Sequence, residues 1–260
     1  MMSGEHVICL DNLTSGNINN VSRWLNNPKF LFIEHDILDP KIDIKVDKIW
    51  HFSCVASPAL YQLDPIKTLN VCFNGTLNLL ELARLNNAKF LLASSSEVYG
   101  TPEDHAIPTK EDYIGTIPTR SSRSCYDIGK QVLETLCYIY FNTYKVPVKV
   151  VRPFNFYGPY MGINDNRVLS NWMKSLLTKQ DIIIYGNGNQ TRTFCYAEDG
   201  IAMCLGVLID GKNGEIYNVG NPTPELSMKE LAIIFCNTLD YKGKYVVRDY
   251  PKYYPKEEPL

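Results

Sequence analysis

The residue pair with the clearest chemical potential is Tyr126-x-x-x-Lys130, at the start of a predicted helix. Residues four apart share one face of a helix, so the phenol and the ammonium can point into the same cleft. A positive charge close to a phenol favours the phenolate and lowers the pKa of the tyrosine. The pair therefore predicts a general base near neutral pH. A half-buried tyrosine beside a solvated lysine would give the same spacing, so the pair alone does not decide.

A run of hydroxyl side chains precedes this pair. Residues 94–100 read Ser-Ser-Ser-Glu-Val-Tyr-Gly and follow a predicted strand at 90–93. A hydroxyl at the carboxyl end of a strand can hydrogen-bond a substrate hydroxyl or ketone beside the tyrosine. The alternative is a polar loop, in which serine runs are common.

Short apolar runs alternate with longer helical patterns, which is typical of a mostly parallel sheet covered by helices. The predicted strands are residues 7–10, 30–33, 49–52, 90–93, 148–151, 182–185 and 216–219. The predicted helices are residues 65–86, capped by Asp64, and residues 126–142, 168–177, 197–209 and 227–239. We expect ligands at the carboxyl ends of the strands, where open α/β sheets bind them.

Composition excludes several classes of protein. The 260 residues carry a formal net charge of −2 and no basic block, which argues against a nucleic-acid partner. No apolar run approaches the roughly 18 to 20 residues that a membrane span needs, and residues 1–6 lack the apolar core of a signal peptide. We therefore expect a soluble, cytoplasmic protein without a membrane partner. The eight cysteines are expected to be free and mostly buried, and the four scattered histidines predict no metal site.

Four segments together resemble the extended short-chain dehydrogenase/reductase family, in the NAD-dependent epimerase/dehydratase branch that acts on nucleotide sugars. They are residues 93–100, 123–130, 152–159 and 188–194. Within this branch they resemble most the UDP-glucuronate decarboxylases, or UDP-xylose synthases. The discriminating pair is Ser96-Glu97, because 4,6-dehydratases usually carry Asp-Glu there and epimerases usually lack the glutamate.

The resemblance implies a Rossmann-like fold in two parts. Residues 1–152 would form the NAD-binding domain. Residues 153–260 would mainly form a smaller nucleotide-sugar-binding part, with segments that return to the first domain. The implied reaction is decarboxylation of UDP-glucuronate through a 4-keto intermediate, with Tyr126, Lys130, Ser95 and Glu97 as catalytic residues.

The resemblance also implies binding residues. NAD would be held by Asp11, Asn12, Asp36, Ile37, Ser57, Asn70, Tyr126 and Lys130. A carboxylate at Asp11 disfavours a 2′-phosphate, which favours NAD over NADP. The UDP-sugar would contact Asn155, Val168, Tyr185 and Arg192, and the positive charge of Arg192 would pair with the negative charge of the pyrophosphate. Two alternatives remain open: Asp11-Asn12 as a plain turn, and Tyr185 as a core aromatic residue.

The chain departs from the family pattern at both ends. Six residues precede the strand at 7–10, and no Gly-x-x-Gly-x-x-Gly occurs, so the first strand-helix unit with its glycine-rich turn is expected to be missing. The C-terminal stretch 253–260 stops where relatives usually continue. Two alternatives therefore stand beside the decarboxylase: a catalytically impaired nucleotide-sugar-binding relative, and a 4,6-dehydratase or 4-epimerase.

Helix composition predicts a homodimer. The helix that starts near Tyr126 carries more apolar side chains than one sheet face requires: Val132, Leu133, Leu136, Cys137, Tyr140 and Phe141. Relatives bury such helices in a two-fold interface, and symmetric dimers are the commonest soluble assembly. The alternative is that this face belongs to the core of one chain.

Overall fold

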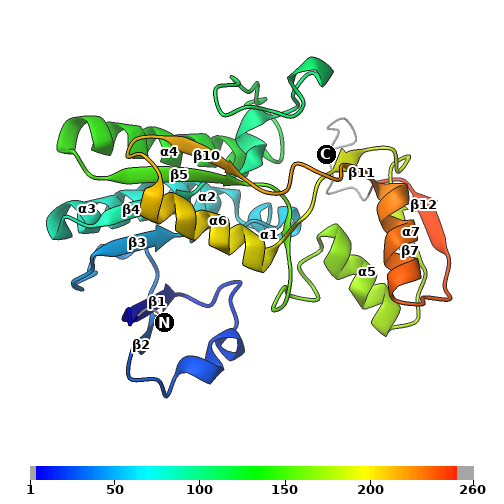
Figure 1. Cartoon of the computed structure of the whole chain (residues 1–260), viewed down its shortest axis with the longest axis horizontal. Helices are drawn as coiled ribbons and strands as arrows, with labels where there is room; N and C mark the ends of the chain where they lie inside the picture. Colours follow the sequence, from blue (N-terminus) through cyan, green and yellow to red (C-terminus); the bar gives the residue numbers. More distant parts are fainter. Residues whose placement is uncertain (1–3, 251–260) are drawn as a thin grey trace.

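Four parallel strands form the main sheet, in the order β10–β5–β4–β3 (Figure 1). They are β3 (Lys48–His51), β4 (Lys89–Ala93), β5 (Val148–Pro153) and β10 (Ile216–Val219). The computed structural model describes residues 4–250, so the C-terminal stretch 253–260 lies outside the described residues. The two central strands, β4 and β5, are almost entirely buried, which explains their continuous apolar runs.

A separate parallel pair, β1 (Val7–Asp11) and β2 (Phe30–Glu34), lies beside this sheet. Within residues 4–250, these two strands pair with each other and not with β3. Figure 1 shows them on the β3 side of the molecule, near the N-terminus. The expected α/β fold with mostly parallel strands is confirmed, and the strands belong to more than one sheet.

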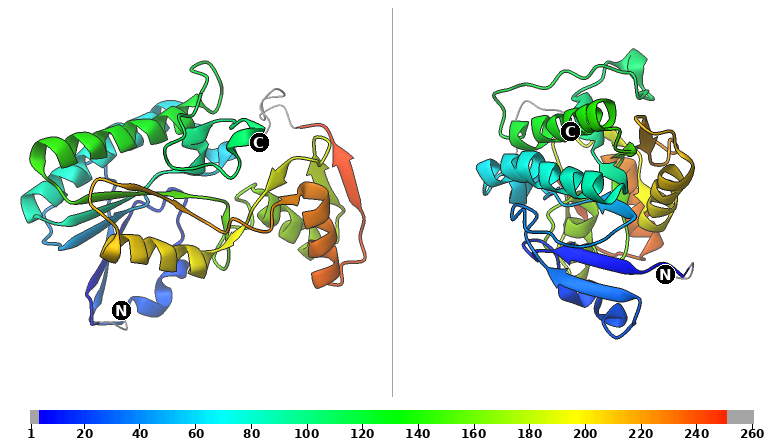
Figure 2. Two further views of the ribbon diagram at one scale, coloured as in Figure 1. Left: turned by 45° about the horizontal axis from the view of Figure 1, so that its top comes forward. Right: turned by 90° about the vertical axis from the view of Figure 1, so that its left-hand side faces the viewer.

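Helices cover both faces of the main sheet, as the two views of Figure 2 show. On one face lie α2 (Pro65–Asn70), α3 (Thr76–Asn86) and α4 (Ser124–Tyr144), and on the other lies α6 (Ala197–Asp210). The larger core cluster joins α3 and α4 to β3, β4 and β5, and includes Leu80, Phe90 and Leu133. A smaller cluster joins α6 to β4, β5 and β10.

The predicted helix 65–86 is divided by one wider turn. Asp64 caps its start, because its side chain accepts a hydrogen bond from the Lys67 backbone N–H at 2.9 Å. Residues Val71–Gly75 then form a π-helical turn between α2 and α3. A single wide turn barely disturbs the apolar spacing, so the sequence pattern did not reveal it.

The apolar face expected on α4 mostly belongs to the core of this chain. Leu133, Leu136, Cys137 and Tyr140 are buried against the sheet and α3. Exposed apolar side chains include Tyr138 and Ile139 on another face of α4, Ile66 on α2 and Phe73 in the π-helical turn. Four of the six side chains that suggested a dimer surface therefore belong to the core of this chain, and Val132 and Phe141 are partly buried.

The remaining elements form a smaller body. Helices α5 (Val168–Leu177) and α7 (Met228–Thr238) pack on the parallel pair β7 (Ile182–Tyr185) and β12 (Tyr245–Arg248). Buried Trp172 donates its indole N–H to the Ile183 carbonyl at 2.8 Å. Two short pairs, β6 (Phe156–Tyr157) with β9 (Cys195–Tyr196) and β8 (Thr191–Arg192) with β11 (Leu226–Ser227), adjoin this body. Strand β12 was not predicted, because its side chains are mostly exposed.

All eight cysteines are free, and five of them are buried, as expected. Within residues 4–250, no three or more His, Cys, Asp or Glu side chains are grouped so as to hold a metal ion. In the same residues, no helix is both long and apolar enough to cross a membrane.

Two leucines on α3 test this packing. Leu80 is fully buried, whereas Leu85 is 70% exposed. We expect Leu80→Ala to lower the free energy of unfolding by roughly 2–5 kcal/mol, because it leaves a cavity in the main core. Leu85→Ala should change it by less than about 0.5 kcal/mol. Equal losses in urea unfolding would contradict the assigned core.

Candidate active site

A cavity of about 460 Å³ opens where the main sheet meets the smaller body. Its wall is built from the carboxyl ends of β4 and β5, the start of α4, the short helix α1 (Pro58–Tyr61), and residues of α5, β7 and β8. This is the strand edge at which the sequence predicted ligand binding.

Helix α4 presents both members of the Tyr-Lys pair to this cavity. Tyr126 is 6% exposed and Lys130 is 4% exposed, so the reading of a solvated lysine is wrong. The Lys130 ammonium donates to the carbonyl of Ala93, the last residue of β4, at 2.8 Å. It also lies 5.5 Å from the centre of the Tyr126 ring. The expected shared face is therefore confirmed.

Burial acts against ionisation of the phenol. It raises the pKa of Tyr126 above the ordinary value, and a negative charge on the nearby Cys54 acts in the same direction. Hydrogen bonding with the Ser95 side chain opposes this rise. The prediction of a lowered pKa is thus wrong for the protein by itself, because desolvation and nearby negative charge outweigh the hydrogen bond with Ser95.

The serine run lies at the end of β4, as predicted. Ser95 is 8% exposed and caps the 3-10 turn Ser96–Tyr99, because its Oγ accepts a hydrogen bond from the Glu97 backbone N–H at 3.2 Å. The turn directs Ser95 and Glu97 to the cavity that Tyr126 lines. The four expected catalytic residues therefore lie in one cavity wall.

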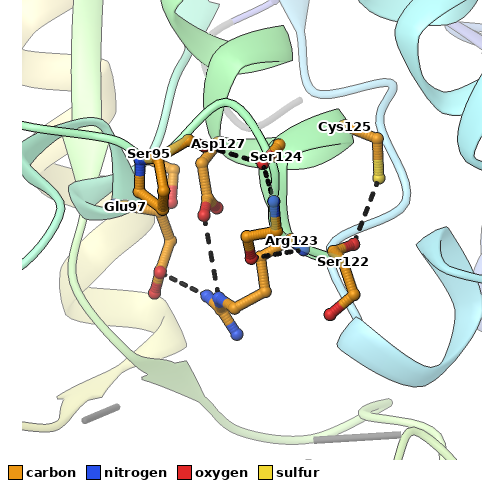
Figure 3. A network of polar contacts seen from close by, with 9 residues as sticks. Ser95, Glu97, Ser122, Arg123, Ser124, Cys125 and Asp127 are labelled. Atoms are coloured by element: carbon orange, nitrogen blue, oxygen red, sulfur yellow. Dashed lines mark hydrogen bonds and ion pairs between the residues drawn. The ribbon is translucent and has the colours of Figure 1, made fainter. Parts of the chain in front are cut away.

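Glu97 is held by an arginine that the sequence reading missed. The Arg123 guanidinium donates to Glu97 and lies 3.7 Å from the Asp127 carboxylate (Figure 3). Arg123 is 6% exposed and its pKa is raised, since attraction to these acids outweighs burial. Arg123 lies three residues before Tyr126, within the segment 123–130 that resembles the family. This position is the sequence feature from which its role could have been predicted.

A second buried arginine fixes the strand ends beneath the cavity. Arg152 of β5 makes a two-pronged ion pair with Glu134 of α4, at 2.9 and 2.8 Å. The Ser94 hydroxyl donates to the same carboxylate. Glu134 thereby joins α4 to the ends of β4 and β5.

Tyr61 of α1 is a further residue that the sequence did not single out. Its ring lies parallel to the Tyr126 ring, 4.9 Å away and tilted by 8°. The side chain is 1% exposed, and its hydroxyl has no hydrogen-bond partner within the described residues. Tyr61 thus lines the cavity and keeps a buried hydroxyl whose hydrogen-bonding capacity is unsatisfied.

The four expected substrate residues all line the cavity: Asn155, Val168, Tyr185 and Arg192. Asn155 donates its side-chain amide to the Thr193 carbonyl at 3.0 Å. Tyr185 is half-buried and faces Tyr250 at 6.2 Å between ring centres, so it is not a core residue. Burial lowers the pKa of Arg192, which stays far above neutrality as for any arginine.

The residues expected at the adenosine end of NAD lie outside this cavity. Asp11 ends β1, and its Oδ1 accepts the Leu13 N–H at 2.7 Å, so the plain-turn geometry is present. Asn12 donates its side-chain amide to Asp36, which follows β2, at 3.0 Å. These polar groups gather at the carboxyl ends of two parallel strands, a position suited to a ribose and a base.

The other three residues expected to bind the cofactor lie outside the cavity as well. Ile37 is buried in the main core. Ser57 is also buried, and its hydroxyl donates to the Asp165 carbonyl. Asn70 is exposed on α2 and accepts a hydrogen bond from Asn74. None of the three side chains lines the cavity.

Comparison with known proteins agrees with this geometry. Residues 1–220 match the NAD dependent epimerase/dehydratase family. UDP-glucuronic acid decarboxylase 4 of Arabidopsis thaliana is 42% identical over 95% of this chain and 55% of its own length. UDP-glucuronic acid decarboxylase 1 of Xenopus tropicalis is 43% identical over 85% of this chain and 52% of its own length. The chain thus spans about half the length of these relatives.

Solved structures share the fold. A dTDP-glucose 4,6-dehydratase from Streptomyces venezuelae, solved with NAD bound, is 26% identical, with a TM-score of 0.84 over 98% of this chain and 79% of that one. A UDP-glucose 4-epimerase from Thermotoga maritima is 24% identical, with a TM-score of 0.86 over 96% of this chain and 80% of that one. The second match concerns the fold alone.

Two ion pairs test the support beneath the cavity. Glu134 and Arg152 are about nine-tenths buried, with side chains 12% and 9% exposed, whereas the Glu81–Arg84 pair is 38% and 41% exposed. We expect Glu134→Gln to lower the free energy of unfolding by about 3 kcal/mol, because it leaves a buried cation without its counter-charge. Glu81→Gln should cost less than about 1 kcal/mol. Similar losses for both variants in urea unfolding would refute the assigned role of Glu134.

Proposed function

Since the chain belongs to the NAD-dependent epimerase/dehydratase family, we propose that it catalyses the NAD-dependent decarboxylation of UDP-glucuronate to UDP-xylose. The observation that carries the proposal is the convergence of Tyr126, Lys130, Ser95 and Glu97 on one cavity. The names of the relatives at 42–43% identity support this reaction within the family.

The chain offers residues for both ends of the cofactor. Asp11 and Asp36 would bind the adenosine part at the ends of β1 and β2, with Asn12 bridging the two loops. Ile37, Ser57 and Asn70 are proposed along the path between the two ends. Lys130 and Tyr126 would hold the nicotinamide ribose in the cavity. When bound, NAD would accept hydride from C4 of the sugar and later return it.

Tyr126 would act as the base that takes the proton of the sugar 4-hydroxyl. Because burial raises the pKa of this phenol, it needs help to ionise. The Lys130 ammonium and hydrogen bonding with Ser95 both favour the phenolate. Ser95 would then hold the oxygen at C4 as it becomes a ketone.

The 4-ketone stands β to the sugar carboxylate, so the carbon–carbon bond breaks readily. Its electron pair passes to the C4 oxygen as an enolate, carbon dioxide leaves, and C5 takes up a proton. Glu97, fixed by Arg123, would assist at this carbon. Tyr126 would finally return its proton to the C4 oxygen as the alcohol forms again.

The nucleotide would occupy the part of the cavity formed by residues 153–260. Asn155, Val168, Tyr185 and Arg192 come from this part, and Arg192 supplies positive charge for the pyrophosphate. We propose this part as the nucleotide-sugar-binding unit and residues 1–152 as the cofactor-binding unit. Strand β10 and helix α6 return from the second part to the main sheet.

The reaction is tested by incubating the folded chain with UDP-glucuronate and NAD. UDP-xylose and carbon dioxide should appear, and NAD should be regenerated. Absence of UDP-xylose from folded protein refutes the proposal for this chain. Parallel reactions with UDP-glucose and dTDP-glucose identify a 4-epimerase or a 4,6-dehydratase by their products.

A second candidate is a protein that binds the nucleotide sugar without turnover. The observation in its favour is that β1 and β2 form a sheet of their own, separate from the main sheet. The residues proposed for the adenosine end of NAD, Asp11 and Asp36, are therefore not held by the sheet that leads into the cavity. Calorimetry distinguishes the two candidates. Binding of UDP without binding of NAD supports the second candidate, and tight binding of NAD excludes it.

We also propose that two copies of the chain associate through α2 and α4. Ile66 of α2 is 80% exposed, Phe73 of the adjoining π-helical turn is 46% exposed and Tyr138 of α4 is 68% exposed, and these three segments pack together. Exposed apolar side chains gathered on neighbouring helices are typical of an interface.

This association is measurable by light scattering at micromolar concentration. The unaltered chain should have twice the monomer mass, and the double variant Ile66→Glu with Tyr138→Glu should have the monomer mass, because buried charge opposes association. Ile233→Glu, at a 48% exposed position on α7, serves as the control and should leave the mass unchanged. A monomeric unaltered chain would exclude the dimer.

Removal of one hydroxyl tests the assignment of the base. We expect Tyr126→Phe to lower kcat by on the order of 100- to 10,000-fold, because no other group is assigned to take the 4-hydroxyl proton. The melting temperature should change little, since the ring is retained. Tyr144→Phe, at a 52% exposed position of the same helix, should keep full activity. If Tyr126→Phe retains most of the rate, Tyr126 is not the base.

A further inference from the structure

Two cysteine sulfurs face each other at the wall of the cavity, one in the wall and one buried behind it. Cys54 lies in the loop after β3 and lines the cavity. Cys72 lies in the π-helical turn Val71–Gly75 and is 1% exposed. Their Sγ atoms are 3.6 Å apart and form a hydrogen bond. The proposed mechanism uses neither thiol.

The surroundings of Cys54 differ from those of the other cysteines. The hydrogen bond from Cys72 lowers the pKa of the Cys54 thiol, and the charge of Lys130 acts in the same direction, against burial. The same contact raises the pKa of Cys72. Burial raises the pKa of the other six thiols, all of which lie in the described residues. Cys54 therefore combines thiolate character with access from the cavity.

We propose that Cys54 and Cys72 are an oxidisable dithiol pair, which hydrogen peroxide converts to a disulfide in the cavity wall. The Cys54 thiolate attacks peroxide, so that a sulfur–oxygen bond forms, the oxygen–oxygen bond breaks and water leaves after protonation. Cys72 then attacks the Cys54 sulfenic acid and displaces a second water. In sum, two thiols and one peroxide give one disulfide and two waters.

The local structure allows this closure. A disulfide needs about 2 Å between its sulfurs, so the two side chains must approach by roughly 1.5 Å. Cys54 is in a loop without helix or strand, which can supply this movement. A reactive thiolate beside a second thiol is the usual arrangement of a redox-sensing pair.

The pair also touches the catalytic helix. A Cβ at Gly129 of α4 would come within 2.9 Å of the Cys72 Sγ, so this sulfur packs directly on the helix that carries Tyr126 and Lys130. Cys54 packs against the Tyr61–Tyr126 ring stack. A disulfide would tie the loop, the π-helical turn and the cavity wall together next to α4.

The first experiment treats the whole folded chain with hydrogen peroxide and analyses an unreduced digest by mass spectrometry. We expect a linked pair of peptides containing Cys54 and Cys72, lighter by two hydrogen atoms than the separate peptides and released by a thiol reductant. Recovery of both residues as free thiols would overturn the proposal. So would oxidation of Cys54 to sulfinic acid with Cys72 left free.

Variants separate the two roles. With Cys72→Ala, the Cys54 sulfenic acid has no resolving thiol and should be trapped by dimedone. With Cys54→Ala, Cys72 should stay a thiol under the same treatment. Cys236→Ala removes a partly exposed cysteine in another part of the fold and should leave the cross-link unchanged. Trapping of Cys72, or a cross-link that involves Cys236, would contradict the assigned pair.

Alkylation tests the proposal in the unaltered chain, so the result does not depend on whether a variant folds. At neutral pH, Cys54 should react with iodoacetamide on the order of tenfold faster than Cys236, because a larger share of it is thiolate. Both side chains are partly buried, so access alone does not predict this order. Faster reaction of Cys236 would refute the proposal.

Discussion

One buried hydrogen bond, from the Lys130 ammonium to the Ala93 carbonyl, fixes the relation between helix α4 and strand β4. A buried ammonium without a partner would cost several kcal/mol, so the helix must keep this contact. Tyr126 lies one turn before Lys130, and the serine run begins directly after Ala93. Tyr126 and the hydroxyls around it are therefore positioned by the same contact.

A second set of buried charges supports the first. Glu134, two turns beyond Tyr126, binds Ser94 after β4 and Arg152 at the end of β5. The side of the cavity that holds Tyr126 thus rests on a helix and two strands whose ends are joined. The facing side comes from short strand pairs and from α5, and includes Arg192.

The burial that positions Tyr126 also opposes its ionisation. Desolvation raises the pKa of the phenol, and the thiolate character of Cys54 acts in the same direction. The nearby Lys130 and Ser95 offset only part of this effect. Positive charge brought into the cavity by a ligand would favour the phenolate further, which couples deprotonation to ligand binding. The Cys54–Cys72 pair therefore lies where a change of sulfur charge acts on the pKa of Tyr126.

The sequence by itself determined the strands of the main sheet, the helix that carries Tyr126 and Lys130, and the serine run after β4. Periodicity and spacing record which face of an element is buried and which residues share it. Only the tertiary structure decided that Arg123 pairs with Glu97, that Tyr61 stacks on Tyr126, that β1 and β2 form their own sheet, and that two sulfurs meet across the cavity wall. Such contacts join residues far apart in the chain or depend on side-chain direction. The desolvation of Tyr126 is the combined result of all the residues that pack around it. For that reason the sequence predicted that Tyr126, Lys130, Ser95 and Glu97 lie together, but missed Arg123 and Tyr61 and gave the wrong direction for the tyrosine pKa.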